Sequence, residues 1–206
     1  MKSDEALAPN DSSFPLALFT SMLKGEPVQL PGPYCETLFK NSKNIVDQFR
    51  GWFPELSTPQ FVNPQTCLRS PAESQRVGLL FTCGVDSFYS LLKNQEEITD
   101  LIFVHGFDID LDNHALRKEV SEAVREVAGH FGKNLIEVET DVRSYLEQGL
   151  KLHWPYSHGA ALATVAHSLS HLISKVYLAS SHATPDVSKW GTHPHVDPYW
   201  SSSALQ

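Results

Sequence analysis

Residues 77–87 carry the pattern with the clearest chemical potential. A short apolar run is followed by a turn of small residues that ends in Asp86-Ser87, and residues 88–93 then look helical. This order of residue types predicts a strand, a tight loop and the start of a helix. Backbone N–H groups at a helix start have no partner within the helix and form a site for an anion, most often a phosphate. Nucleotide chemistry is therefore the first hypothesis, and a structural turn with Asp86 as helix N-cap is the alternative.

The chain around this loop alternates between strand and helix. We expect strands at 77–81, 101–105, 134–138 and 175–179, and helices at 86–93, about 112–131 and 159–173. Such alternation builds a parallel sheet with right-handed crossovers, in which ligands bind beyond the carboxyl ends of the strands. The most unusual polar segments of the chain follow those ends, at 82–87, 105–108, 139–141 and 180–203.

The part of the chain before residue 77 has a different character. Residues 1–13 are polar and we expect them to be disordered. Helical spacing of apolar residues at 14–23 and 38–52, followed by a proline-containing stretch, makes 14–76 a helical extension with a connector. Residues 77–206 form the expected ligand-binding domain.

Composition limits the partners and the compartment. The net charge is −8, with 24 acidic and 16 basic residues, which argues against nucleic acid because binding phosphates along a backbone needs clustered Lys and Arg. The three cysteines lack CxxC spacing, so we expect no structural zinc, no disulfide framework and a reducing, cytoplasmic setting. With no run of 18 apolar residues and no signal-like start, we expect neither a membrane span nor a signal peptide.

Residues 82–87, Thr-Cys-Gly-Val-Asp-Ser, resemble the PP-loop Ser-Gly-Gly-x-Asp-Ser of ATP pyrophosphatases with the adenine-nucleotide alpha-hydrolase (HUP) fold. Four segments (84–93, 103–109, 158–163 and 190–194) are also similar to bacterial PP-loop proteins related to 7-cyano-7-deazaguanine synthase. The resemblance covers most of 14–200. It implies an α/β three-layer sandwich with a parallel, Rossmann-like sheet, preceded by a short helical segment.

The resemblance also implies a reaction. Attack on the α-phosphate of ATP would adenylate a small-molecule substrate and release pyrophosphate, for amidation, ligation or thiolation. Asp86 and Ser87 would be catalytic, with the Ser87 hydroxyl on the pyrophosphate and Mg²⁺ held by Asp86 and Asp108. The residues implied for the nucleotide are Thr82, Cys83, Gly84, Val85, Asp86, Ser87, His105, Gly106, Asp108, His158 and Gly159.

Two later segments are expected at the site, the first at the phosphates of the nucleotide and the second at the acceptor substrate. Gly159 should open the third helix of the domain, with its N-terminus toward the phosphates and His158 just before it. The polar loop after the fourth strand should shape the acceptor pocket through Ser181, His182, Asp186 and Trp190.

Two departures from the family pattern keep another function open. Cys83 replaces a glycine, which costs about 1–2 kcal/mol if the position has positive φ; otherwise the thiol intrudes on the pyrophosphate. A helix N-terminus also lowers a thiol pKa, so a reactive Cys83 is a further option. Relatives continue past the position of Gln206, so we expect a fragment or a natural truncation. The alternatives are a nucleotide-binding module without turnover and, less favoured, a structural protein that binds no nucleotide.

Histidines and tryptophans leave smaller questions. His167 and His171 are four residues apart on the expected helix, a spacing of metal ligands, but without a third ligand they fit polar gaps in a buried helix better. His193 and His195 fit a metal site less well than an acceptor pocket. Three tryptophans lie near the expected pocket: Trp154, Trp190 and Trp200. They fit either the pocket lining or an interface between copies of the chain, so the question of a homo-oligomer stays open.

Overall fold

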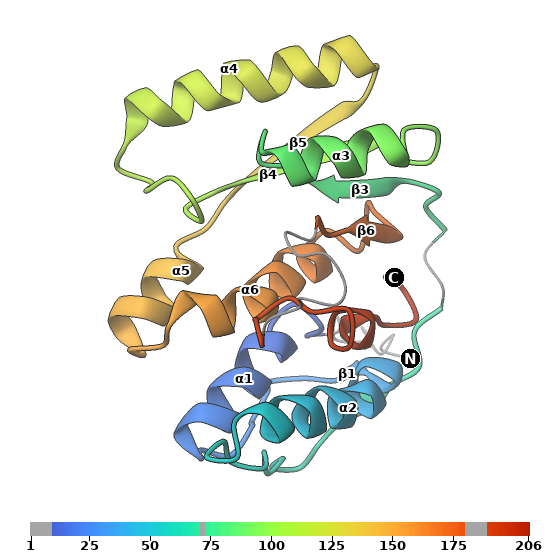
Figure 1. Cartoon of the computed structure of the whole chain (residues 1–206). Coiled ribbons are helices and arrows are strands. Elements are labelled where there is room, and N and C mark those ends of the chain that lie inside the picture. Colours follow the sequence, from blue (N-terminus) through green and yellow to red (C-terminus); the bar gives the residue numbers. More distant parts are fainter. Residues whose placement is uncertain (1–9, 71–72, 180–188) are drawn as a thin grey trace, which may run out of the picture. The chain divides into compact units, whose positions relative to one another are not determined.

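A computed structural model describes residues 10–70, 73–179 and 189–206. The chain divides into two compact units, each continuous in space but not in sequence (Figure 1). We call residues 1–71, 159–168 and 194–206 the helical unit, and residues 72–158 and 169–193 the sheet unit. These units divide the chain differently from the expected split into a 14–76 extension and a 77–206 domain, because two later segments belong to the first unit.

The sheet unit is built on four parallel strands, in the order β5-β4-β3-β6. Their bounds are Val77–Leu80 for β3, Asp100–His105 for β4, Asn134–Glu139 for β5 and Lys175–Tyr177 for β6. The chain adds β4 and β5 on one side of β3 and then returns to place β6 on the other side. This order creates a switch point between β3 and β6, where ligands bind in open α/β sheets. The chain is thus an α/β protein with a parallel sheet compatible with a Rossmann-like fold.

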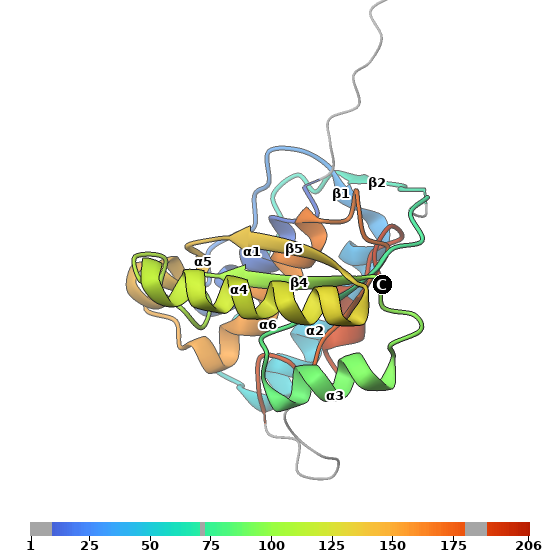
Figure 2. The ribbon, with the colours of Figure 1, turned by 90° about the horizontal axis from the view of Figure 1, so that it is seen from above.

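Two helices pack on one face of this sheet. They are α3 (Val85–Lys93), which follows β3, and α4 (His114–Phe131), which lies over β4 and β5 (Figure 2). Their shared core is aliphatic and aromatic, and consists of Leu79, Phe81, Leu91, Ile98, Leu101, Phe103, Val124 and Ala128. Asn113 caps α4 by accepting a hydrogen bond from the Leu116 amide at 3.2 Å, and left-handed Gly132 ends the helix.

The segment after β5 differs from the expectation. A short helix α5 (Val142–Ser144) runs into a π-helical turn η1 (Tyr145–Gly149), and α6 then spans Trp154–Ser168. The predicted helix of 159–173 therefore begins and ends five residues too late. Pro155 lies in the first turn of α6, where a missing N–H is tolerated, and marks the true start. Gly159 consequently lies inside the helix, and His171 lies beyond its end.

The helical unit combines α1 (Phe14–Lys24), α2 (Glu36–Trp52), a 3-10 turn η2 (Asp197–Trp200) and residues 159–168 of α6. Two short parallel strands, β1 (Tyr34–Cys35) and β2 (Thr66–Cys67), pair beside them. The buried core draws on all these segments, with Phe14, Leu18, Phe19, Leu38, Ile45, Phe49, Ala160, Ala163, Val196 and Trp200 among its members.

The expectation of disorder up to residue 13 is wrong for its last part. Asp11 is 1% exposed and accepts hydrogen bonds from the Cys35 amide and from Arg69, both at 2.7 Å. A buried carboxylate needs such partners, and they fix the chain just before α1. Residues 1–9, which carry the rest of that expectation, lie outside the described residues.

His167 is a buried polar residue of α6. Its Nε2 lies 2.8 Å from the Trp200 carbonyl oxygen and therefore carries the proton, while Nδ1 is buried without a hydrogen-bond partner. Burial lowers the pKa of His167, since protonation would place a charge where nothing receives it. This agrees with a polar gap in a buried helix. Within the described residues, no cluster of three His, Cys, Asp or Glu side chains forms a metal site.

This burial predicts a loss of stability in mild acid. In the unfolded chain, His167 binds a proton near the ordinary histidine pKa of about 6.5. In the folded chain, burial disfavours this protonation. The free energy of unfolding should therefore fall as pH drops below about 6.5. His167→Gln keeps a donor for the Trp200 carbonyl and should flatten this slope by up to about 1.4 kcal/mol per pH unit. Urea unfolding of wild type and His167→Gln between about pH 5 and pH 7.5 measures this slope. If the free energies of unfolding of the two proteins changed in parallel with pH, His167 would not be the group responsible.

Candidate functional site

The loop between β3 and α3 makes a tight turn at the carboxyl end of β3. The Phe81 amide bonds the Ile102 carbonyl at 2.9 Å, so pairing with β4 continues one residue past β3. Cys83 then takes the left-handed conformation with φ of 60°, and extended Gly84 occupies the N-cap position of α3. The expected strand, loop and helix start are confirmed, and the loop lies at the switch point of the sheet.

The first turn of α3 has no side chain that caps it. The N-cap residue is Gly84, and Asp86 lies one residue into the helix with its side chain exposed. The alternative in which Asp86 caps the helix is therefore wrong. The backbone N–H groups at this helix start have no capping carboxylate, and the loop that precedes them is open to solvent at Thr82, Gly84 and Val85.

Ser87 braces this loop from inside. It is 2% exposed, and its hydroxyl donates to the Gly84 carbonyl at 2.8 Å. On the outer side, the Gly84 amide lies 3.4 Å from the Thr82 hydroxyl. The loop is therefore held by its own side chains.

Cys83 is a strained residue in a half-buried place. Its positive φ costs a residue with a side chain about 1–2 kcal/mol, which matches one of the two possibilities raised by the glycine in the PP-loop pattern that this loop resembles. The thiol packs against the core of the sheet unit instead of projecting freely. Burial raises the pKa of Cys83, which opposes the expectation of a reactive thiolate.

The residues at the end of β4 make contacts within the fold. His105 is 3% exposed, and its Nε2 lies 3.0 Å from Glu137 Oε2 and 3.3 Å from the Ser121 hydroxyl. Gly106 has φ of 95°, and a Cβ there would overlap the Thr140 carbonyl oxygen. Both residues were expected at the nucleotide, and the structure shows that internal packing also requires them.

Asp108, three residues after the end of β4, is an exposed carboxylate beside the Arg143 guanidinium. Its carboxylate lies 4.0 Å from Arg143, which donates to the Phe107 carbonyl at 2.5 Å and to Glu147 at 3.0 Å. Asp86 and Asp108 both follow the carboxyl ends of neighbouring strands, β3 and β4. That they hold Mg²⁺ together stays a prediction. Sequence reasoning missed Arg143, whose only signal was its place just after the third strand.

A row of aromatic rings joins three segments of the sheet unit. The ring centroids of Phe107 and Trp154 are 5.0 Å apart, those of Trp154 and His158 5.9 Å, and those of His158 and Trp190 5.7 Å. The Arg143 guanidinium lies 4.9 Å from the Trp154 ring centroid. The aromatic row thus brings together His158 and Trp190, which the sequence had assigned to nucleotide and acceptor.

His158 is held as a neutral ring. Its Nδ1 lies 3.1 Å from the Trp154 carbonyl and its Nε2 3.1 Å from the Thr192 hydroxyl. Because the carbonyl only accepts, Nδ1 is the protonated nitrogen and Nε2 accepts from Thr192. Burial lowers the pKa of His158, although the backbone hydrogen bonds partly oppose it.

The remaining expected site residues lie either away from the β3–α3 loop or outside the described residues. Gly159 lies within α6, so no helix begins there, and the expectation that this glycine presents a helix N-terminus to phosphates is wrong. Ser181, His182 and Asp186 lie outside the described residues.

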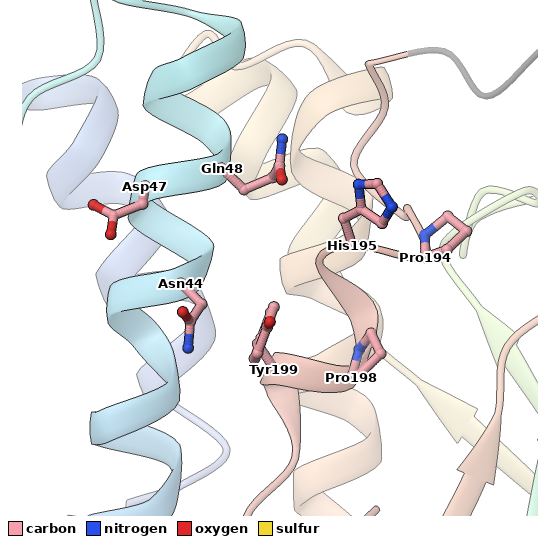
Figure 3. A pocket seen from close by; sticks show the side chains of 7 residues that line it. All are labelled: Asn44, Asp47, Gln48, Pro194, His195, Pro198 and Tyr199. Carbon is pink, nitrogen blue, oxygen red and sulfur yellow. The ribbon is translucent and has the colours of Figure 1, made fainter.

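The helical unit contains a separate pocket of about 530 Å³, with both polar and apolar lining. Asn44 and Gln48 project from α2 toward the segment that carries His195 and Tyr199 (Figure 3). Its volume is in the range of small-molecule pockets. Its lining consists of Asn44, Asp47, Gln48, Pro194, His195, Pro198 and Tyr199.

Comparisons with protein-family models, curated proteins and solved structures give no significant match for this chain. Among the described helices, none has both the length and the apolar character needed to cross a membrane.

Proposed function

We propose that this chain binds MgATP at the β3–α3 loop and adenylates a small-molecule substrate with release of pyrophosphate, as a PP-loop protein of the HUP fold. One observation carries the proposal. A loop with a left-handed residue at 83 leads into a nine-residue helix without a capping side chain, at the switch point of a parallel sheet.

The electrostatics of the loop favour a phosphate group. The helix dipole places roughly half a positive charge at the start of α3, where the N–H groups of the first turn point outward. Exposed Thr82, Gly84 and Val85 leave room for phosphate oxygens to approach the backbone. Cys83 packs against the core, so its thiol is compatible with a phosphate in the loop.

Asp86 and Asp108 are the residues that would hold Mg²⁺. Both carboxylates are exposed, and Mg²⁺ prefers carboxylate oxygens together with phosphate oxygens. Without a cation, Asp86 would repel the phosphates beside it. Bound Mg²⁺ supplies the charge that neutralises them.

The proposed reaction is adenylation by in-line attack. An oxygen or nitrogen of the substrate bonds to the α-phosphorus while the bond to the bridging oxygen of the β-phosphate breaks, and pyrophosphate leaves. The protein contributes position and charge. The helix start holds phosphate oxygens, and the exposed part of the aromatic row offers Trp190 as a flat surface for a planar group.

The second candidate is a nucleotide-binding module without turnover. The strained Cys83 favours it, because its Cβ restricts a backbone that the family leaves to glycine. The two candidates differ in one product. Only the enzyme releases pyrophosphate when substrate and MgATP are both present.

A calorimetric titration with MgATP tests the binding that both candidates share. We expect saturable binding that Asp86→Asn weakens roughly 10- to 100-fold, by removing the charge beside the metal while keeping the shape. Glu119→Gln removes another exposed charge, from α4, and should bind like wild type. Equal affinity of the two variants would contradict the site.

A further inference from the structure

Two cysteines of the helical unit lie at opposite positions in paired strands. Cys35 of β1 and Cys67 of β2 are register partners in a parallel ladder, as are Tyr34 and Thr66. Neighbouring strands lie about 4.7–4.9 Å apart, and a disulfide needs a Cα separation of about 4.4–6.8 Å. Side chains of register partners emerge on the same face of the ladder. The backbone therefore already has the spacing that a disulfide requires.

The two thiols have different surroundings. Cys35 is 1% exposed and lies at the start of α2, with its Sγ 3.3 Å from the Ser203 hydroxyl and 3.4 Å from the Ser203 amide. Burial raises the pKa of Cys35, but Ser203 and the amides of Thr37 and Leu38 outweigh it and lower the pKa. Cys35 is thus suited to react as a thiolate.

Cys67 is the more accessible partner. Its side chain is partly exposed, whereas Cys35 is fully buried. Burial and the nearby Asp11 carboxylate raise the pKa of Cys67. A reagent from solvent therefore reaches Cys67, and Cys35 supplies the better internal nucleophile.

We propose that Cys35 and Cys67 form a redox-active dithiol that closes to a disulfide by exchange with a low-molecular-weight disulfide. The Cys67 thiolate attacks the reagent, forming a mixed disulfide and releasing one thiol. The Cys35 thiolate then attacks the Cys67 sulfur, forming the Cys35–Cys67 bond and releasing the second thiol. The protein loses two electrons and two protons, and the reagent disulfide is reduced to two thiols.

Closure would constrain a defined part of the molecule. The bond joins the residue before α2 to the connector at β2, and so closes the chain segment 35–67. Linking distant residues reduces the entropy of the unfolded chain, so oxidation should stabilise the helical unit. This inference is independent of the proposed nucleotide site, which lies in the sheet unit.

The test uses the native full-length protein with glutathione disulfide. We expect the three free thiols to fall to one, with Cys35 and Cys67 in a single linked peptide. The melting temperature should rise by roughly 5–10 °C and return after reduction with dithiothreitol. Persistence of all three thiols in the folded protein, or a link through Cys83, would overturn the proposal.

Single variants separate the two roles. Cys35→Ser should fold, because Ser is a preferred residue at a helix start, and should retain one glutathione on Cys67. Cys67→Ser should form no intramolecular disulfide, and Cys83→Ser should still form the Cys35–Cys67 disulfide. A Cys35→Ser protein that takes up no glutathione, or a Cys67→Ser protein labelled as fast as wild type, would contradict entry at Cys67.

Discussion

Cys83→Gly should bind MgATP several-fold more tightly than wild type and unfold with a free energy about 1 kcal/mol higher. The residue has φ of 60°, where glycine lacks the clash that a Cβ makes with its own backbone. The gain is limited because glycine adds entropy to the unfolded chain and removes the thiol from the core of the sheet unit. Calorimetry with MgATP and urea unfolding measure the two effects.

Two further variants separate binding from stability. Cys83→Val places a β-branched side chain in the left-handed region, so it should weaken both nucleotide binding and stability. Asn63→Gly relieves the positive φ of another residue, at 45° in the helical unit, and should leave MgATP binding unchanged. If Cys83→Gly bound MgATP no better than wild type, strain at this position would not limit the site.

Gly106→Ala should be the most destabilising single substitution considered, with a loss of about 3–5 kcal/mol in the free energy of unfolding. The backbone there has φ of 95°, and an added Cβ overlaps the Thr140 carbonyl oxygen. Because backbone at both positions must move, the ends of β4 and β5 cannot keep their pairing. Urea unfolding followed by circular dichroism measures the loss.

Gly129→Ala is the matched control. Gly129 lies in α4 with nothing within 4 Å of an added Cβ, so alanine should stabilise the protein by about 0.5–1 kcal/mol. A Gly106→Ala protein as stable as Gly129→Ala would show that the close approach at Thr140 is absent in solution.

The sequence predicted the loop and the sheet because their signals are local. Apolar runs marked all four strands to within about two residues. The loop of 82–87 carries its own turn residues. A positive φ at Cys83, where the PP-loop pattern that the loop resembles has glycine, was one of two possibilities left open, and the observed φ is 60°. The alternation of these strands with helices along the chain then implied a parallel sheet.

Other features depend on contacts that one sequence does not display. Asp11 is ordered because Arg69 and the Cys35 amide, distant in sequence, satisfy its carboxylate. The pairing of Cys35 with Cys67 arises from two-residue strands too short to have a period. The start of α6 at Trp154 was missed because the helix was predicted from an apolar run that begins only at Gly159, whereas the first turn contains Pro155, which a helix start tolerates.

The most direct test of the account is a nitrogen-15 NMR titration of the full chain with MgATP. Binding at the proposed site should shift the backbone amides of residues 84–87 first and most strongly, because those N–H groups would meet the phosphates. The same titration with Asp86→Asn should leave these amides nearly unmoved at equal nucleotide concentration. Saturable shifts confined to other residues, or no shifts at all in folded wild-type protein, would contradict a nucleotide site at the β3–α3 loop.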